Sequence, residues 1–183
     1  MYSRLEVDVM RVTEVKDNIL ILEYRQDSSD EDYGSCLWAR FYFNLDKYEL
    51  LISSDCGSYG YKWPVAKRET FLELMARCND DYILGKIYGS PDVFDYDETK
   101  KRLYDMYKDE PYSIENLNQI YADIEQCYEG TDSADEFIRV FDEFNSYFYD
   151  TWEFPVKVYP NNVLKIVQVF ENYIKPKIKE IIK

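Results

Sequence analysis

The chain has 183 residues, of which 36 are acidic and 22 are basic, so its formal net charge is −14. Negative charge of this size disfavours binding to nucleic acids and anionic membrane surfaces, and it favours the basic groove of another protein. Histidine is absent, which excludes Ser-His-Asp and Cys-His catalysis, histidine-ligated zinc and proton transfer through imidazole.

Residues 1–64 carry the pattern of successive β-strands. Short apolar or alternating segments at 5–9, 18–25, 37–44 and 48–53 are separated by turns and by an acidic loop at 26–34. The alternation of Tyr59, Tyr61 and Trp63 places three rings on one face of a further strand, which we expect to pack against a helix that begins near Thr70. Short connections between successive strands favour an antiparallel meander.

After Pro64 the apolar residues recur at helical spacing. The pairs Thr70 with Glu73 and Ser133 with Glu136 fit the capping box that begins a helix. Further helices are expected from about residues 79, 98, 113 and 161, and residues 151–159 are expected to be extended. Pro176 is expected to kink or end the last helix, because it has no N–H and clashes with the preceding turn.

These elements predict an α+β fold with an N-terminal antiparallel meander of about five strands followed by a helical half of about five to six helices. We expect residues 1–90 to form the sheet with a helical hairpin. Residues 91–183 are expected to form an acidic helical region with a basic C-terminal helix, either as a second subdomain or as part of one compact domain. Apolar runs of roughly 20 residues, which a membrane span needs, are absent, and we expect a cytoplasmic protein without membrane contact.

The cysteines do not form a zinc-binding pattern. There are four of them, far apart in the sequence and without a CxxC pair: Cys36, Cys56, Cys78 and Cys127. We expect reduced thiols, no four-cysteine metal site and no cofactor. Asp55 beside Cys56 could supply an activated thiol, but no histidine is available as its base, so Asp55 and Gly57 are interpreted as residues of a hairpin turn.

The segment that follows Pro91 contains residues typical of one class of metal-dependent enzyme. Asp92, Glu98 and Lys100 are similar to the Pro-Asp…Glu-x-Lys pattern in which two carboxylates hold Mg²⁺ and a lysine helps to activate water. They are the candidate catalytic residues of a metal-dependent nuclease. The competing interpretation is that Glu98 lies at the start of a helix, where an acidic side chain is favoured by the helix dipole.

Acidic side chains are the candidate binding residues. The acids at 27–32 lack the order of an EF-hand loop, so we expect a solvated surface able to meet a basic partner rather than a Ca²⁺ site. Helical acids three or four residues apart can form rows of charge, although an ordinary solvated face has the same pattern. The candidates are Asp30, Glu31, Asp32, Asp105, Asp109, Asp132, Asp135, Glu136, Asp142 and Glu143.

The segment YELLISSDCGSYGYKWP at 48–64, followed by ETFLELMARCNDDYILGKI at 69–87, resembles a motif of small phage and prophage proteins of Gram-positive bacteria. Some small acidic phage proteins of this kind are anti-CRISPR inhibitors of Cas9. The resemblance implies a protein of the bacterial host cell that binds Cas9 or its guide-RNA complex and blocks engagement of guide RNA or target DNA, with guide-RNA trimming as one possible result.

The resemblance covers under a quarter of the chain and transfers no catalytic residue. Two other functions therefore stay open. One is the metal-dependent nuclease, and the other is an immunity or antitoxin-type protein that masks a different basic partner.

Overall fold

The computed structural model describes residues 17–107, 115, 118–119, 122, 133–144 and 153–183. The chain divides into two compact units, with residues 1–87 and 165–183 in unit 1 and residues 88–164 in unit 2. The change of unit at residue 88 lies close to the boundary expected near residue 90. The C-terminal helix, which was expected to continue the second region, lies from Lys165 onward in unit 1.

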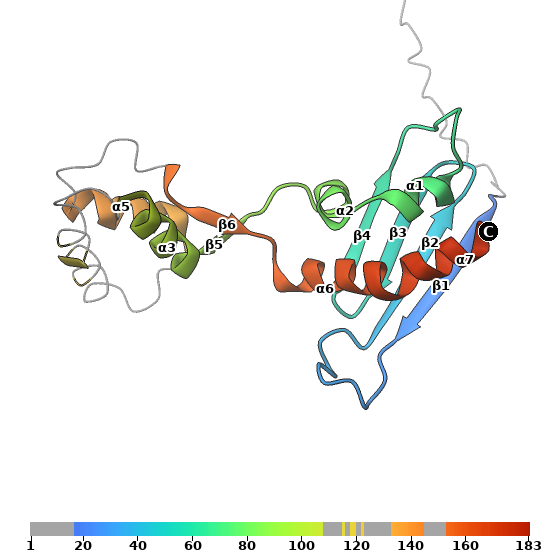
Figure 1. The fold of residues 1–183 in the computed structure, drawn as a ribbon, viewed down its shortest axis with the longest axis horizontal. Helices are drawn as coiled ribbons and strands as arrows, with labels where there is room; N and C mark the ends of the chain where they lie inside the picture. The colour runs from blue at the N-terminus through green and yellow to red at the C-terminus, as the bar shows by residue number, and fades with distance from the viewer. Residues whose placement is uncertain (1–16, 108–114, 116–117, 120–121, 123–132, 145–152) are drawn as a thin grey trace, which may run out of the picture. The chain divides into compact units, whose positions relative to one another are not determined.

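Unit 1 contains a four-stranded antiparallel sheet in the order β1-β2-β3-β4 (Figure 1). Its strands are β1 (Ile19–Arg25), β2 (Trp38–Asn44), β3 (Glu49–Ser54) and β4 (Gly57–Lys62). Each strand pairs with the next one in the sequence, so the predicted meander is confirmed. The additional strand expected at residues 5–9 lies outside the described residues.

The two faces of the sheet differ in burial. The two central strands bury one face completely, with Phe41, Phe43 and Leu50 at 0% exposure. On the opposite face Ile21 and Leu51 are 54% and 50% exposed. This alternation follows from the two-residue period of a strand, which sends successive side chains to opposite faces. The buried face forms the core of unit 1.

Two short helices follow the sheet, α1 (Phe71–Arg77) and α2 (Asp80–Ile87). The predicted capping box is present at α1, where the Glu73 carboxylate accepts the Thr70 N–H at 2.6 Å and the Thr70 hydroxyl accepts the Glu73 N–H at 3.3 Å. The Phe71 ring lies 5.5 Å from that of Trp63. The expected packing against the helix after Thr70 is therefore confirmed for Trp63, which directly follows β4, and the Tyr61 ring lies against that of Trp63 at 4.8 Å.

The C-terminal helix is formed by α6 (Asn161–Val169), a π-helical turn η2 (Phe170–Ile174) and α7 (Lys175–Ile181). Within unit 1, Phe170 lies 6.2 Å from the Phe41 ring, and Tyr173 lies 4.8 Å from that of Tyr24. Pro176 does not end the helix. It lies in the first turn of α7, where a missing N–H costs little, directly after the π turn.

Unit 2 contains the short strands β5 (Val93–Asp95) and β6 (Val156–Val158), which pair antiparallel, and the helices α3 (Tyr96–Tyr107) and α5 (Ala134–Phe144). The buried Thr99 hydroxyl of α3 links β5 and β6, since it donates to Asp95 O at 2.6 Å and accepts the Val156 N–H at 2.8 Å. The extended segment expected at 151–159 thus contains β6. The Ser133 hydroxyl accepts the Glu136 N–H at 3.1 Å, which is the N-cap bond of the predicted capping box. Most of the helix expected from residue 113 lies outside the described residues.

Candidate functional site

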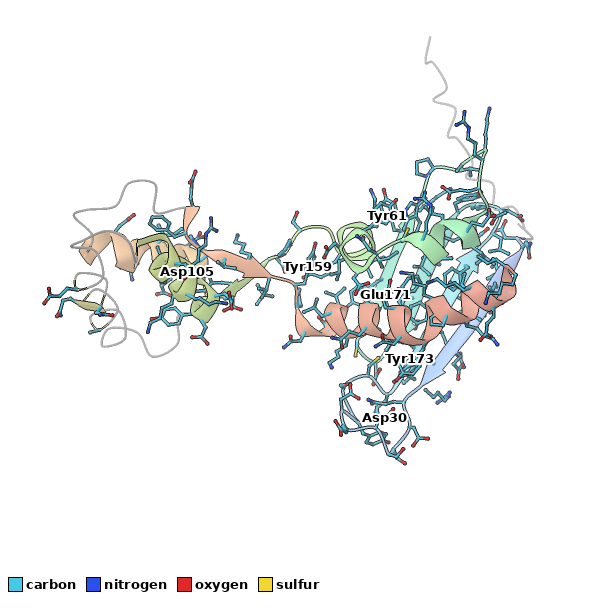
Figure 2. All side chains as sticks on the ribbon, in the orientation of Figure 1. Asp30, Tyr61, Asp105, Tyr159, Glu171 and Tyr173 are labelled. Atoms are coloured by element: carbon cyan, nitrogen blue, oxygen red, sulfur yellow. The ribbon has the colours of Figure 1, made fainter. Side chains whose placement is uncertain are left out.

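The loop between β1 and β2, residues 26–35, is the most acidic surface segment of unit 1 that the structure describes; it is called the acidic loop below. It contains Asp27, Asp30, Glu31 and Asp32 and no lysine or arginine. Figure 2 shows Asp30 on this loop, beyond the ends of the strands. The three loop residues among the predicted binding residues, Asp30, Glu31 and Asp32, therefore lie on one short segment.

Internal hydrogen bonds hold the acidic loop in a defined conformation. The Ser29 N–H and hydroxyl donate to Asp27 Oδ1 at 2.9 and 2.7 Å, and the Asp27 N–H donates to Asp30 Oδ2 at 3.1 Å. The Gln26 amide donates to Asp32 Oδ1 at 3.0 Å. Asp and Ser commonly form local side-chain bonds of this kind with the backbone of turns. The loop can thus present its charge without first becoming ordered.

The acidic loop keeps most of its negative charge. Lys165 Nζ lies 3.4 Å from Asp32 Oδ2 and makes the loop's one ion pair among the described residues. Hydrogen bonds from Ser35, aided by Lys165, lower the pKa of Asp32, and those from Ser29 lower the pKa of Asp27. Both carboxylates are therefore ionised at neutral pH, and one lysine faces four acids.

Asp55 fixes the end of the acidic loop. It lies in the turn between β3 and β4, and its carboxylate accepts the Leu37 N–H at 2.8 Å and the Trp38 N–H at 3.3 Å. The Gln26 N–H donates to Leu37 O at 3.0 Å and closes the loop from the other side. Asp55 thus joins two turns that are far apart in the sequence.

The turn at residues 54–57 has the character that the sequence predicted. Gly57 has a φ of 121°, which favours glycine. The Ser54 hydroxyl donates to Gly57 O at 2.7 Å and accepts the Cys56 N–H at 3.2 Å. The motif therefore forms a hairpin turn, and the role of the Asp55 carboxylate at the acidic loop is what sequence reasoning missed.

Two thiols lie beside Asp55. Cys36 is 2% exposed, and its Sγ lies 3.7 Å from Asp55 Oδ1. Cys56 Sγ lies 3.1 Å from Ser35 O. Burial raises the pKa of both thiols, so both are protonated and poorly nucleophilic at neutral pH. The interpretation of Cys56 as a structural residue rather than a nucleophile agrees with this environment.

Cys36, Asp55 and Cys56 bring potential metal ligands together. One ligand atom from each lies within 4.8 Å of the other two, and this is the one such group of three among the described residues. The two cysteines are 20 positions apart in the sequence, and therefore no short spacing motif indicated the group.

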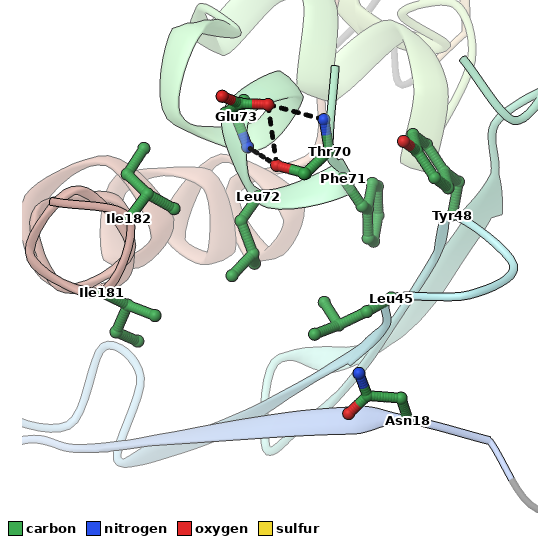
Figure 3. A pocket seen from close by; sticks show the side chains of 9 residues that line it. All are labelled: Asn18, Leu45, Tyr48, Thr70, Phe71, Leu72, Glu73, Ile181 and Ile182. Carbon is green, nitrogen blue, oxygen red and sulfur yellow. Dashed lines mark hydrogen bonds between the residues drawn. The ribbon is translucent and has the colours of Figure 1, made fainter. Parts of the chain in front are cut away.

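A hollow in unit 1, lined by the start of α1 and the end of the C-terminal helix, offers few polar groups to a ligand (Figure 3). Its volume is about 470 Å³, and Leu72, Ile181 and Ile182 supply apolar side chains. Of its polar side chains, Thr70 and Glu73 are bonded to each other in the capping box, and the Tyr48 hydroxyl donates to backbone carbonyl groups. Ligand pockets usually combine an apolar wall with a few polar groups that converge on the ligand. We therefore do not select this hollow as the functional site.

The candidate nuclease residues have separate partners in unit 2. Asp92 accepts the Tyr88 hydroxyl at 2.9 Å, and Glu98 pairs with Lys101 at 3.0 Å in the first turn of α3. Lys100 Nζ lies 5.9 Å from the centre of the Tyr96 ring. The interpretation of Glu98 as a helix-start residue agrees with its position, and the nuclease stays an untested hypothesis.

The helical acids of unit 2 form a more mixed surface than the acidic loop. Asp105 lies on α3, which also carries Lys101 and Arg102 on exposed positions (Figure 2). On α5 the exposed Asp135 and Asp142 flank the exposed Arg139.

Of the other predicted binding residues, Glu136 pairs with Arg139 at 3.9 Å. Glu143 lies on α5, but its side chain is not described. Asp109 and Asp132 lie outside the described residues. The helices therefore interleave basic residues that the acidic loop lacks.

Among the described residues, every helix is too short or too polar to cross a membrane. A model of a phage protein family, Phage_phiTE_072, matches residues 10–180 of the chain. No curated protein and no solved structure matches it. The family match spans both units, whereas the motif resemblance noted in the sequence covers only part of unit 1.

Proposed function

The chain belongs to this phage family, and from that premise we propose that it is a stoichiometric inhibitor with which a phage blocks a host protein that has a basic nucleic-acid-binding groove. The proposed partner is a Cas9-type CRISPR effector, free or bound to guide RNA, inside the bacterial host cell. The acidic loop is the proposed primary contact, and the acids of α3 and α5 are a second one.

The observation that carries the proposal is the acidic loop itself. It concentrates four carboxylates in ten residues, with a single lysine beside them among the described residues. Its internal hydrogen bonds and the Asp55 contacts fix its backbone before any partner arrives. A pre-ordered loop loses less conformational entropy on binding than a flexible acidic tail. Such a loop can place its charge where a phosphate backbone would otherwise lie.

The proposed mechanism is competition for positive charge. Cas9-type proteins hold the guide–target heteroduplex in a basic channel and recognise its backbone and shape. A rigid row of carboxylates in that channel would exclude the nucleic acid, because both need the same arginine and lysine side chains. Binding before guide RNA is loaded would leave the guide exposed to host nucleases, which would trim it. No catalytic residue of the inhibitor is required.

The direct test is DNA cleavage by a purified Cas9-type nuclease, with the protein added either before or after the guide RNA. We expect inhibition that saturates near an equimolar ratio, and stronger inhibition when the protein is added first. The guide RNA should be run on a denaturing gel to detect trimming. Full cleavage at large molar excess in both orders of addition would reject the proposed partner.

Two variants test the proposed surface. Asp30→Asn/Glu31→Gln/Asp32→Asn removes three charges from the acidic loop, and the amide oxygens at 30 and 32 can still accept the bonds from the Asp27 N–H and the Gln26 amide. The matched control, Glu49→Gln/Asp81→Asn/Glu180→Gln, removes three charges elsewhere in unit 1. We expect the loop variant alone to lose inhibition. Equal losses in both variants would point to net charge rather than to the acidic loop.

Salt and metal separate the binding mechanism from the nuclease. Inhibition that depends on the acidic loop should weaken steeply as the salt concentration rises, since opposite charges on two surfaces are screened. Inhibitor binding needs no metal-dependent catalytic step and should persist in EDTA. Nucleic-acid cleavage by the chain alone that disappears in EDTA and in Asp92→Ala would favour the nuclease instead.

A further inference from the structure

Three potential metal ligands lie close together at the end of the acidic loop, and they come from two separate turns. Cys36 precedes β2, and Asp55 and Cys56 lie in the turn between β3 and β4. The antiparallel register of β2 and β3, in which Ala39 lies opposite Ser54, sets the alignment of these two segments. The convergence is therefore a consequence of the sheet register and does not depend on a flexible segment.

We propose that Cys36, Asp55 and Cys56 bind one Zn²⁺ ion. The geometry fits a tetrahedral site. With Zn–S of about 2.3 Å and Zn–O of about 2.1 Å, a sulfur and an oxygen ligand lie about 3.6 Å apart. Cys36 Sγ and Asp55 Oδ1 are 3.7 Å apart. All three ligand atoms lie within 4.8 Å of one another, so small side-chain rotations suffice to close the site around the ion.

The ligand types select zinc among the common divalent metals. Two thiolates and one carboxylate suit a borderline-soft ion, whereas Mg²⁺ and Ca²⁺ require oxygen ligands throughout. Three protein ligands leave a fourth position for water or for a side chain of a partner. The Leu37 and Trp38 N–H groups that bond Asp55 would orient its carboxylate in the manner of outer-shell groups at known metal sites.

The charges near the site are compatible with the ion. Two thiolates and a carboxylate bring three negative charges, of which Zn²⁺ neutralises two. Zinc binding would release the two thiol protons to solvent, because the metal-bound form of cysteine is the thiolate.

The site would act on the acidic loop. Cys36 directly follows the loop, and Cys56 Sγ already lies 3.1 Å from Ser35 O. A metal ion would join the loop's end to the turn at residues 54–57 by coordinate bonds in addition to the Asp55 hydrogen bonds. This inference stands without the proposed function, since the ligand group is observed whatever the loop binds.

The test is titration of the fully reduced, chelator-treated full chain with Co²⁺, followed by Zn²⁺. We expect one equivalent of Co²⁺ to produce a thiolate-to-cobalt charge-transfer band and the intense visible bands of four-coordinate cobalt. Zn²⁺ should bleach both bands and should raise the melting temperature. The absence of a charge-transfer band at several equivalents of Co²⁺ would overturn the proposal.

Variants locate the metal. Cys56→Ser, at a partly exposed position, should abolish the charge-transfer band while far-UV circular dichroism stays native. Cys78→Ser, at a buried thiol in the same unit, is the matched control and should keep it. Retention of the band in Cys56→Ser, or its loss in Cys78→Ser with Cys56 intact, would contradict the site.

Mass spectrometry after alkylation provides a second readout. With zinc bound, Cys36 and Cys56 should be protected from the alkylating reagent. The untreated reduced chain should carry the mass of one zinc ion under native spray conditions. If the native mass shows no zinc and Cys36 and Cys56 form a disulfide in air, the metal site is rejected and the two residues are a redox-active thiol pair.

Discussion

The Asp55 carboxylate should control both the stability of unit 1 and the order of the acidic loop. The perturbation is Asp55→Asn, measured in EDTA so that metal binding does not contribute. The side chain keeps its size, but it exchanges one acceptor oxygen for an NH₂ group that faces a backbone N–H. One of the two bonds, to Leu37 or to Trp38, must therefore be lost.

The magnitude follows from the two bonds. A hydrogen bond to a charged group contributes roughly 1.5–3 kcal/mol when it is protected from water. Asp55 is exposed, so water can replace part of what is lost. We expect the free energy of unfolding to fall by about 1–2 kcal/mol. Asp46→Asn is the matched control, because among the described residues the Asp46 carboxylate accepts a single backbone N–H, that of Asn18 at 3.1 Å. An amide oxygen can retain that bond.

Urea unfolding gives the stability change, and hydrogen exchange gives its location. In Asp55→Asn the amides of Leu37 and Trp38 should exchange faster, while those of Phe41 and Leu50 should follow only the global change in stability. Stability losses equal to those of Asp46→Asn, with unchanged exchange at residues 37 and 38, would refute the assigned role of Asp55.

Three further predictions, with five substitutions, test the fold by thermal or urea unfolding. Gly57→Ala should destabilise the chain by about 1 kcal/mol or more because of its positive φ, whereas Gly85→Ala in α2, where an added Cβ meets no atom within 4 Å, should be stabilising by up to about 1 kcal/mol; the reverse order would contradict the turn. Phe41→Ala should cost about 3–5 kcal/mol, and Ile21→Ala on the exposed sheet face should cost less than about 1 kcal/mol; similar costs would mean that the face is covered. Thr70→Ala should cost about 0.5–2 kcal/mol through loss of the capping box, and no change would reject that box.

Local signals in the sequence were sufficient to predict several elements. The Thr70–Glu73 capping box, the strand alternation and the turn glycine Gly57 each depend on residues within a few positions of one another. For such elements, short-range sterics and hydrogen bonding decide the conformation. The acidic loop was likewise evident from composition, because four acids among ten residues seldom occupy a buried position.

Long-range pairings could not be predicted in the same way. Lys165 and Asp32 are 133 positions apart, and Cys36 meets Cys56 only because β2 and β3 adopt one particular register. The apolar stripe of the C-terminal helix indicated that one face is buried, but it did not identify the partner. The helix packs on the sheet of unit 1, where the Phe170 ring lies near that of Phe41. The same sequence pattern is equally compatible with burial against the preceding helical region.

The division of unit 1 between two distant stretches of chain has a consequence for synthesis on the ribosome. The strands emerge first, whereas Phe170, Ile174 and Ile178, which are buried in the finished unit, are translated only after all of residues 88–164. During that interval the growing chain lacks part of the cover for its aromatic sheet face. A nascent chain in this state is a natural substrate for host chaperones, and translation pauses within residues 88–164 should prolong its exposure to aggregation.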